Sequence, residues 1–172
     1  MIQVGQHAPE FTLEGISDGE FITSSLSEYR GKWVVLFFWP LDFTFICPTE
    51  ILEFSARIKE FDELNAVVLG ASTDSKYAHK AWTERLGEIN FPMLSDITKD
   101  VSRDYGILIE GQGIALRGAF IVDPQGKIRY QLVHDLSVGR SVDEILRVLG
   151  ALQTGELCPV AWTPGAPTLG KA

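Results

Sequence analysis

The stretch Lys32–Glu50, KWVVLFFWPLDFTFICPTE, places a cysteine between a predicted buried strand and a predicted helix. Residues 33–39 form an unbroken apolar run that ends at a proline, which is typical of a strand buried on both faces. From Glu50 onward apolar residues recur at helical spacing, and Pro48 suits the first turn of that helix. The sequence therefore predicts Cys47 at the start of a helix.

This position has a chemical consequence for Cys47. Helix N-termini carry free backbone N–H groups and the positive end of the helix dipole. A thiol held there ionises more readily, and the thiolate is the nucleophilic form of cysteine. The position favours a reactive cysteine, with a buried and inert cysteine as the alternative.

The length and the charge of the chain are those of a single acidic domain. The chain has 172 residues, with 15 Lys and Arg against 23 Asp and Glu, a net charge of −8. This length is sufficient to bury a core without disulfides. The acidic balance and the lack of a basic cluster argue against nucleic acid or an anionic membrane as a partner.

The expected location is cytoplasmic. The N-terminal residues show no secretory signal pattern, and no apolar run approaches the roughly 20 residues that span a bilayer. A structural disulfide is uncommon in the cytoplasm, so both cysteines of the chain are redox or catalytic candidates.

The rest of the pattern predicts an α/β protein. Hairpin turns are expected at residues 17–19, 110–113 and 123–126, and a second buried strand at residues 66–72. Further helices are predicted over residues 77–86, 99–105 and 142–152. Strand–helix alternation followed by hairpins predicts a thioredoxin-like fold, with a mixed central sheet flanked by helices on both faces.

The domain prediction is one folded unit over residues 1–162 and a flexible Pro/Gly-rich tail over residues 163–172. Thioredoxins carry Cys-x-x-Cys at the start of this helix, whereas here the fourth position is Glu50. A partner thiol must therefore come from elsewhere, and the only other cysteine is Cys158. A thiol near a mobile C-terminus suits disulfide exchange, although two unrelated cysteines remain the alternative.

Four separated segments resemble one protein family. Residues 38–50 are similar to the P-x-x-x-T-x-x-C active-site signature of the peroxiredoxins, and residues 155–162 resemble the resolving-cysteine segment of their typical two-cysteine subgroup. Residues 117–124 and 138–144 are also similar to that subgroup. The bacterial peroxiredoxins of the alkyl hydroperoxide reductase type show the strongest resemblance.

The resemblance implies a thiol-dependent peroxidase that reduces hydrogen peroxide and organic hydroperoxides in antioxidant defence and redox homeostasis. Cys47 would be the peroxidatic cysteine, which becomes a sulfenic acid. Cys158 of the partner subunit would resolve it as an intersubunit disulfide. A thioredoxin-like or flavoprotein reductase would then reduce that disulfide. The implied assembly is a homodimer, with a ring of dimers such as a decamer as a further possibility.

No cofactor and no metal site are expected. Peroxide reduction by this route needs only thiols. The three histidines, His7, His79 and His134, lack metal-ligand spacing, and no Gly-rich phosphate loop follows a strand.

Two further residues are candidates for direct roles. Thr44 lies one helical turn before Cys47, so its hydroxyl can reach the thiolate and a peroxide oxygen. An ordinary helix N-cap is the alternative for Thr44. The resemblance implies that Arg117 stabilises the thiolate and the negative charge on the leaving oxygen. From its local sequence alone, Arg117 is a solvent-facing arginine on a strand.

Three more residues are implied to support the site. Pro40 would fix the chain and shield the thiolate from water, unless it only ends the strand. Glu50 and Arg140 would hold Arg117 in place, with an ordinary surface charge as the alternative for each.

The sequence also departs from the family pattern. Trp39 stands where the family usually has tyrosine, so the bulk is kept and the hydroxyl is lost. The Gly-Gly-Leu-Gly segment and the C-terminal Tyr-Phe of overoxidation-sensitive members are absent, since residues 106–109 read GILI and the tail reads TPGAPTLGKA. We therefore expect a robust enzyme, in which local unfolding releases Cys47 and Cys158 captures the sulfenic acid before a second peroxide reacts.

Two other functions compete with peroxide reduction. One is a thioredoxin-like scaffold or holdase chaperone whose cysteines are incidental. The other is a dithiol oxidoreductase acting on proteins, against which Glu50 argues because it occupies the position of the second cysteine.

Overall fold

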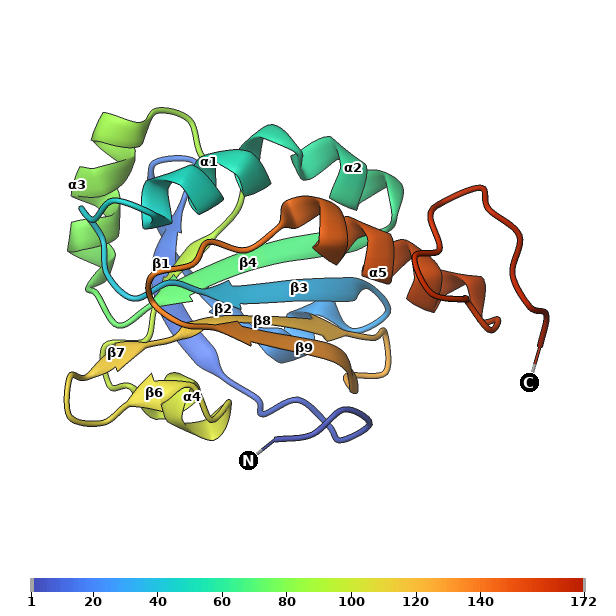
Figure 1. Cartoon of the computed structure of the whole chain (residues 1–172). Helices are drawn as coiled ribbons and strands as arrows, with labels where there is room; N and C mark the ends of the chain where they lie inside the picture. The colour runs from blue at the N-terminus through green and yellow to red at the C-terminus, as the bar shows by residue number, and fades with distance from the viewer. Residues whose placement is uncertain (1, 172) are drawn as a thin grey trace. The chain divides into compact units, whose positions relative to one another are not determined.

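The structure is a computed structural model that describes residues 2–171. It contains two compact units, one ending at Arg140 and the other beginning at Ser141. The sheet belongs to the first unit, whereas helix α5 (Val142–Thr154) and the chain after it belong to the second (Figure 1). No helix in residues 2–171 combines the length and the apolar character that crossing a bilayer requires.

The described part of the first unit has a seven-stranded sheet in the order β2-β1-β5-β4-β3-β8-β9. Its strands are β1 (Thr12–Ser17), β2 (Glu20–Ser25), β3 (Trp33–Phe38), β4 (Ala66–Ser72), β5 (Met93–Ser95), β8 (Arg117–Val122) and β9 (Ile128–His134). A separate hairpin consists of β6 (Leu108–Ile109) and β7 (Ile114–Ala115). The helices of this unit are the 3-10 helix η1 (Leu26–Tyr29), α1 (Cys47–Ala56), α2 (Ile58–Glu63), α3 (Lys76–Leu86) and α4 (Asp100–Asp104).

The sheet is mixed, as predicted. Strands β3, β4 and β5 run parallel, connected by α1 and α2 and then by α3. The pairs β1–β2, β1–β5, β3–β8 and β8–β9 are antiparallel. Parallel strands need crossover connections, and the helices between them supply these.

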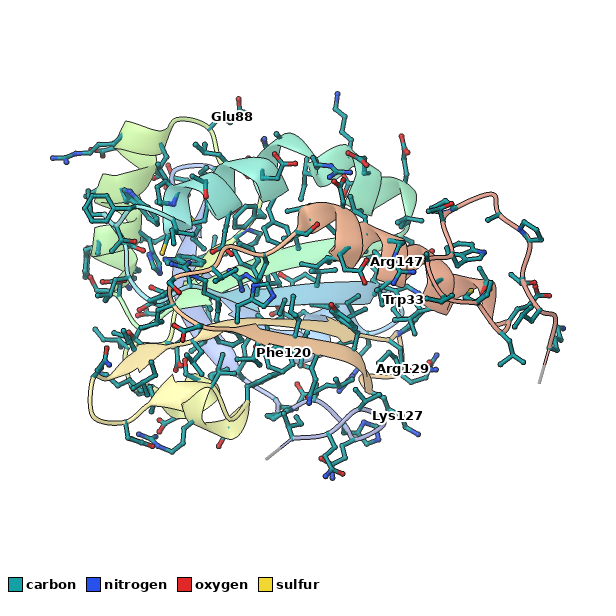
Figure 2. All side chains as sticks on the ribbon, in the orientation of Figure 1. Trp33, Glu88, Phe120, Lys127, Arg129 and Arg147 are labelled. Atoms are coloured by element: carbon teal, nitrogen blue, oxygen red, sulfur yellow. The ribbon has the colours of Figure 1, made fainter. Side chains whose placement is uncertain are left out.

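Central strand β3 is buried on both faces, which explains its unbroken apolar sequence. On one face Phe37 stacks on Phe54 of α1, with ring centroids 4.2 Å apart. On the other face Phe38 meets Tyr105, which directly follows α4, at 5.7 Å. Tyr105 also contacts Phe120 of β8, labelled in Figure 2, at 4.9 Å. The predicted helices on both faces of a mixed sheet are confirmed.

The register of β3 and β8 brings a distant arginine to the end of β3. Phe37 is paired with Ala119, so both side chains lie on the face that α1 covers. Arg117 lies two residues before Ala119, and residues two apart on a strand share a face. Arg117 is therefore level with the carboxyl end of β3, where the chain turns toward α1.

The helical spacing that begins at Glu50 does not correspond to one continuous helix. The backbone of Arg57 has φ −103° and ψ 13°, and this residue separates α1 from α2. Phe54 before the break and Phe61 after it both remain buried, because their rings lie 5.9 Å apart and pack together. The apolar pattern thus predicted the buried face correctly but not the interruption.

In the second unit the C-terminal tail pairs with the segment around Leu157. The Leu157 N–H donates to the Gly170 carbonyl at 2.8 Å, and the Leu169 N–H donates to the Leu157 carbonyl at 2.8 Å. Trp162 donates its indole N–H to the Ala166 carbonyl at 3.0 Å. The flexibility expected of residues 163–172 remains a prediction.

Candidate active site

Cys47 is the first residue of α1, at the helix start that the sequence predicts. It is a free cysteine with no exposed surface. The N-cap position is Ile46, whose side chain makes no capping hydrogen bond, and Pro48 occupies the first turn. Pro48 has no N–H, and the N–H groups of Thr49 and Glu50 donate to the Ile46 carbonyl at 3.0 and 3.3 Å. The positive end of the helix dipole favours a negative charge at this position.

Arg117 provides a positive charge beside this sulfur. Its Nη1 atom lies 3.4 Å from Cys47 Sγ and 2.7 Å from Glu50 Oε2, while its Nε donates to the Leu136 carbonyl at 2.8 Å. Arg117 is only 3% exposed, so the solvent-facing alternative is wrong. The local sequence does not indicate this burial, which follows from the register of β8 against β3.

Glu50 joins Arg117 to Arg140. It lies one helical turn after Cys47, so both side chains are on the same face of α1. Glu50 Oε1 accepts hydrogen bonds from the backbone N and the Nε of Arg140, both at 2.8 Å, and Oε2 accepts from Arg140 Nη2 at 2.9 Å. Burial by itself raises the pKa of Glu50. The hydrogen bonds from Arg140 and the positive charges of Arg140 and Arg117 lower this pKa, and they outweigh the effect of burial. The pKa of Glu50 therefore lies below its ordinary value of 4.5.

Arg140 is held by backbone carbonyls from two neighbouring strands. Its Nη1 donates to the Phe38 carbonyl at 2.7 Å and to the Gly118 carbonyl at 2.5 Å. Its guanidinium carbon lies 5.3 Å from the centroid of the Phe37 ring, within the range of a cation–π contact. Both Glu50 and Arg140 are buried, so the surface-charge alternative is wrong for each.

The charges of this cluster leave an excess of one positive charge. Arg117 and Arg140 carry two guanidinium groups, and Glu50 supplies one carboxylate. Buried charges are costly unless they are paired. A thiolate at Cys47 balances the cluster, whereas a neutral thiol leaves the excess charge uncompensated. The excess positive charge therefore lies beside the Cys47 sulfur, 3.4 Å from the Arg117 guanidinium.

Pro40 and Thr44 lie in the loop between β3 and α1. Pro40 is buried, which agrees with a shielding role but does not establish it. The Thr44 hydroxyl donates to the Leu41 carbonyl at 2.9 Å, so it closes a turn within this loop. The N-cap alternative for Thr44 is wrong, because the cap position belongs to Ile46. Its lone pairs remain available to accept a hydrogen bond, and its role toward peroxide stays a prediction.

Cys158 lies in the second unit, beyond the C-terminal end of α5. It is a free, partly exposed cysteine. Its sulfur lies 3.5 Å from the hydroxyl oxygen of Thr154 and 3.7 Å from the carbonyl of Ala151. These are weak contacts within one short segment, and they leave the thiol partly accessible.

Comparison with known proteins identifies the family. The AhpC/TSA family model matches residues 4–131, a range that contains Cys47 and Arg117. The chain belongs to the AhpC/TSA family.

Its AhpC/TSA relatives include well-matched peroxiredoxins. The chain is 53% identical to "Peroxiredoxin prdx-2" of Caenorhabditis elegans, over 96% of this chain and 88% of that protein. It is 52% identical to the human mitochondrial "Thioredoxin-dependent peroxide reductase", over 96% of this chain and 69% of that protein. The solved structure of reduced Plasmodium vivax 2-Cys peroxiredoxin superposes with a TM-score of 0.93 at 41% identity, covering 96% and 91% of the two chains. The predicted peroxiredoxin family and thioredoxin-like fold are confirmed.

One buried polar pair lies close to this site and has no signal in the local sequence. Asp42, two residues after Pro40, lies with its Oδ2 2.7 Å from His79 Nδ1 on α3. His79 is buried with both ring nitrogens in hydrogen-bond contact. Thirty-seven residues separate the pair along the chain. The spacing of residues in the sequence gives no sign of this contact, because it forms only when α3 packs beside the loop that follows β3.

Proposed function

We propose that this peroxiredoxin reduces hydrogen peroxide and organic hydroperoxides through Cys47, in antioxidant defence. The observation that carries the proposal is the 3.4 Å contact between Arg117 Nη1 and Cys47 Sγ in a cluster with one excess positive charge. The Cys47 thiolate attacks the terminal peroxide oxygen, forming an S–O bond as the O–O bond breaks. The leaving oxygen takes up a proton and departs as water or an alcohol, and Cys47 becomes a sulfenic acid.

Arg117 is suited to stabilise the charge that develops on the leaving oxygen. Its Nε and Nη1 are engaged by Leu136, Glu50 and Cys47, while its Nη2 has no hydrogen-bond partner within residues 2–171. That nitrogen can donate to a peroxide oxygen beside the sulfur. Donors that are fixed in place before the reaction stabilise developing charge without reorganisation.

The second step forms a disulfide with Cys158. The Cys158 thiol attacks the sulfenic sulfur of Cys47, an S–S bond forms, and water leaves with the oxygen of the sulfenic acid. The partly exposed Cys158 thiol supports this role. A thioredoxin-like or flavoprotein reductase then supplies the electrons that regenerate both thiols. The printed name of the human relative, a thioredoxin-dependent peroxide reductase, supports a thioredoxin-like donor.

The proposed working unit is a homodimer in which each Cys47 meets the Cys158 of its partner. Strand β9 supports this proposal, because it is an edge strand of the seven-stranded sheet and can pair with a second copy. Its residues alternate between exposed and partly buried beyond Ile128, and Val133 is exposed. Figure 2 shows Arg129 and Lys127 at the same border of the unit.

A ring of dimers is the proposed larger assembly. It is supported by exposed aromatic side chains, namely Tyr77 on α3 and Phe43 and Phe45 in the loop before α1. Exposed large apolar side chains are candidates for protein–protein contacts. Analytical ultracentrifugation of the reduced and oxidised protein tests both the dimer and the ring.

The experiment for the main proposal combines turnover with gel analysis. Reduced protein is treated with one equivalent of hydrogen peroxide, and the wild type is compared with Cys47→Ser and Cys158→Ser on non-reducing gels. The wild type is expected to form a disulfide-linked dimer, and neither variant should do so. With a thioredoxin system present, the wild type is expected to consume peroxide continuously, whereas Cys47→Ser should not. Equal turnover by Cys47→Ser would overturn the proposal.

A further inference from the structure

The loop of residues 135–140, which follows β9, holds the charged groups beside the active-site sulfur. Its Leu136 carbonyl accepts the Nε–H of Arg117 at 2.8 Å. Its last residue, Arg140, donates its backbone N–H and two side-chain N–H groups to Glu50. The orientation of the Arg117 guanidinium therefore depends on where this loop lies.

The backbone of the loop also packs against the start of α1. A Cβ placed on Gly139 would lie 3.4 Å from Cγ2 of Ile46 and 3.8 Å from Cγ of Glu50. Ile46 directly precedes Cys47 in the chain. Because closely packed groups transmit displacements to their neighbours, the position of Gly139 is coupled to the first turn of α1.

His134, the last residue of β9, donates a hydrogen bond into this loop. Its Nδ1 atom lies 3.3 Å from the Val138 carbonyl and 3.2 Å from the Gly139 carbonyl. A carbonyl oxygen can only accept, so Nδ1 carries a hydrogen that the two oxygens share. The Val138 N–H donates in turn to the Asp135 carbonyl at 3.2 Å. The side chain of His134 thus ties the end of β9 to the second half of the loop.

The register of β8 and β9 places His134 directly opposite Arg117. Side chains that are directly opposed in an antiparallel pair lie on the same face of the sheet. Both therefore lie on the face that α1 covers. Within residues 2–171, no hydrogen bond or ion pair joins His134 to the sulfur or to the charged groups around it. An effect of His134 on the site must therefore pass through the loop.

We propose that His134 is a positioning residue for the peroxide step, because it holds the loop that aims the Arg117 guanidinium at Cys47. The inference rests on the proposed function, since it concerns the first step of that reaction. Without the His134 donor, the Val138 and Gly139 carbonyls can turn to water, and the loop gains freedom. A less firmly oriented guanidinium stabilises the charge on the leaving oxygen less well.

The same change should have little effect on folding. His134 is only partly buried, and Val138 is 52% exposed. Substitutions at such positions usually change stability little. A loss of rate without a loss of stability is therefore the expected signature of a positioning role.

The test compares His134→Ala with His134→Asn in a Cys158→Ser background. Alanine removes the donor. Asparagine carries its amide nitrogen the same number of bonds from the backbone as Nδ1 of histidine, so it can donate to the same two carbonyls. Stopped flow measures the second-order rate constant of Cys47 oxidation by hydrogen peroxide, and thermal unfolding measures stability.

In His134→Ala the rate constant is expected to fall about five- to tenfold, the effect of losing one hydrogen bond. The melting temperature should stay near that of the wild type, and His134→Asn should restore most of the rate. His134→Leu, which keeps side-chain bulk without the donor, should lose the same rate and serves if His134→Ala does not fold.

A double-mutant cycle with Arg117→Lys tests the route of the effect. If His134 acts through the Arg117 guanidinium, His134→Ala should slow the Arg117→Lys protein much less than it slows the wild type. Arg129→Ala is the control, because Arg129 lies near the other end of β9 and its Nη1 donates to Asp123 at 3.3 Å (Figure 2). This control should react with peroxide at the wild-type rate.

Four results would overturn the proposal. They are a wild-type rate in folded His134→Ala, no recovery in His134→Asn, independent losses in the cycle with Arg117→Lys, or an equal loss in Arg129→Ala. A wild type whose Cys47 does not react with peroxide would instead contradict the proposed function itself.

Discussion

Arg117 Nη1 lies 3.4 Å from the sulfur of Cys47, although 70 residues separate the two in the chain. The contact depends on the antiparallel register of β8 against β3, which places Arg117 where α1 begins. The same nitrogen donates to Glu50 at 2.7 Å, so the guanidinium is fixed before any peroxide arrives.

Replacing Arg117 by lysine should slow the reaction of Cys47 with peroxide by about a hundredfold. Lysine keeps a positive charge but loses the planar fork that contacts Cys47, Glu50 and the Leu136 carbonyl together. Stopped-flow measurement of Cys47 oxidation checks this. The control is Arg103→Lys, since Arg103 is an exposed arginine paired with Asp100 and Glu110. Equal losses in both variants would argue against a specific role for Arg117.

Replacing Glu50 by glutamine should lower the free energy of unfolding at pH 7 by about 3 to 5 kcal/mol, because two buried guanidinium groups lose their counter-charge. The pKa of Glu50 is lowered in the folded protein, so its stabilising effect is fully present above its ordinary value of 4.5. That effect is lost as the pH falls through the lower folded value.

Urea unfolding between pH 7 and pH 3 measures this pH dependence. The difference between the wild type and Glu50→Gln should shrink toward acid pH, and a difference that stays constant would contradict the interpretation. Glu144→Gln is the control, because the pKa of Glu144 is lowered by its hydrogen bond with Arg147 at a partly exposed position. That variant should cost less than about 1 kcal/mol.

Replacing Thr44 by valine should slow the peroxide step by about ten- to a hundredfold, whereas Thr44→Ser should stay near the wild type. Valine keeps the shape of threonine but removes the hydroxyl that donates to the Leu41 carbonyl and can accept a hydrogen bond from the peroxide. The second-order rate constant of each variant in the Cys158→Ser background provides the measurement. If valine and threonine give the same rate, Thr44 has no role in the chemistry.

The wild type should resist overoxidation at low peroxide. Cys158 is a free, partly exposed cysteine, and in the proposed reaction disulfide formation should remove the Cys47 sulfenic acid before a second peroxide attacks it. Cys158→Ser should instead accumulate Cys47 sulfinic acid, because the resolving thiol is missing. Mass spectrometry after graded peroxide doses distinguishes the two. Persistent sulfinic acid in the wild type at low peroxide would show that release of Cys47 is slow.

The sequence predicted the elements around Cys47 well because their signals are local. The apolar run of β3 and the proline in the first turn of α1 place Cys47 without knowledge of any distant residue. The helix predicted over residues 142–152 is also present as α5, and the Ser141 hydroxyl caps it by accepting from the Glu144 N–H at 3.2 Å. The Glu144 side chain forms an ion pair with Arg147, which lies one turn along the same helix.

The electrostatics of the site could not be derived from local sequence. Arg117 and Arg140 acquire their partners only when β8 pairs with β3 and the loop after β9 returns to the same edge of the sheet. Resemblance to the family predicted both residues, whereas composition and spacing left them as ordinary arginines. Asp42 and His79 were not predicted by either approach, because a buried pair between a loop and a helix has no periodic signature.

The most direct test of the central claim is the rate at which the reduced protein reacts with hydrogen peroxide, measured by stopped flow in the wild type and in Cys47→Ser. The Arg117–Cys47 contact predicts a second-order rate constant for the wild type that is orders of magnitude above that of a free cysteine thiol, and loss of this reaction in the variant. A wild-type rate similar to that of free cysteine, or one that Cys47→Ser leaves unchanged, would contradict the account.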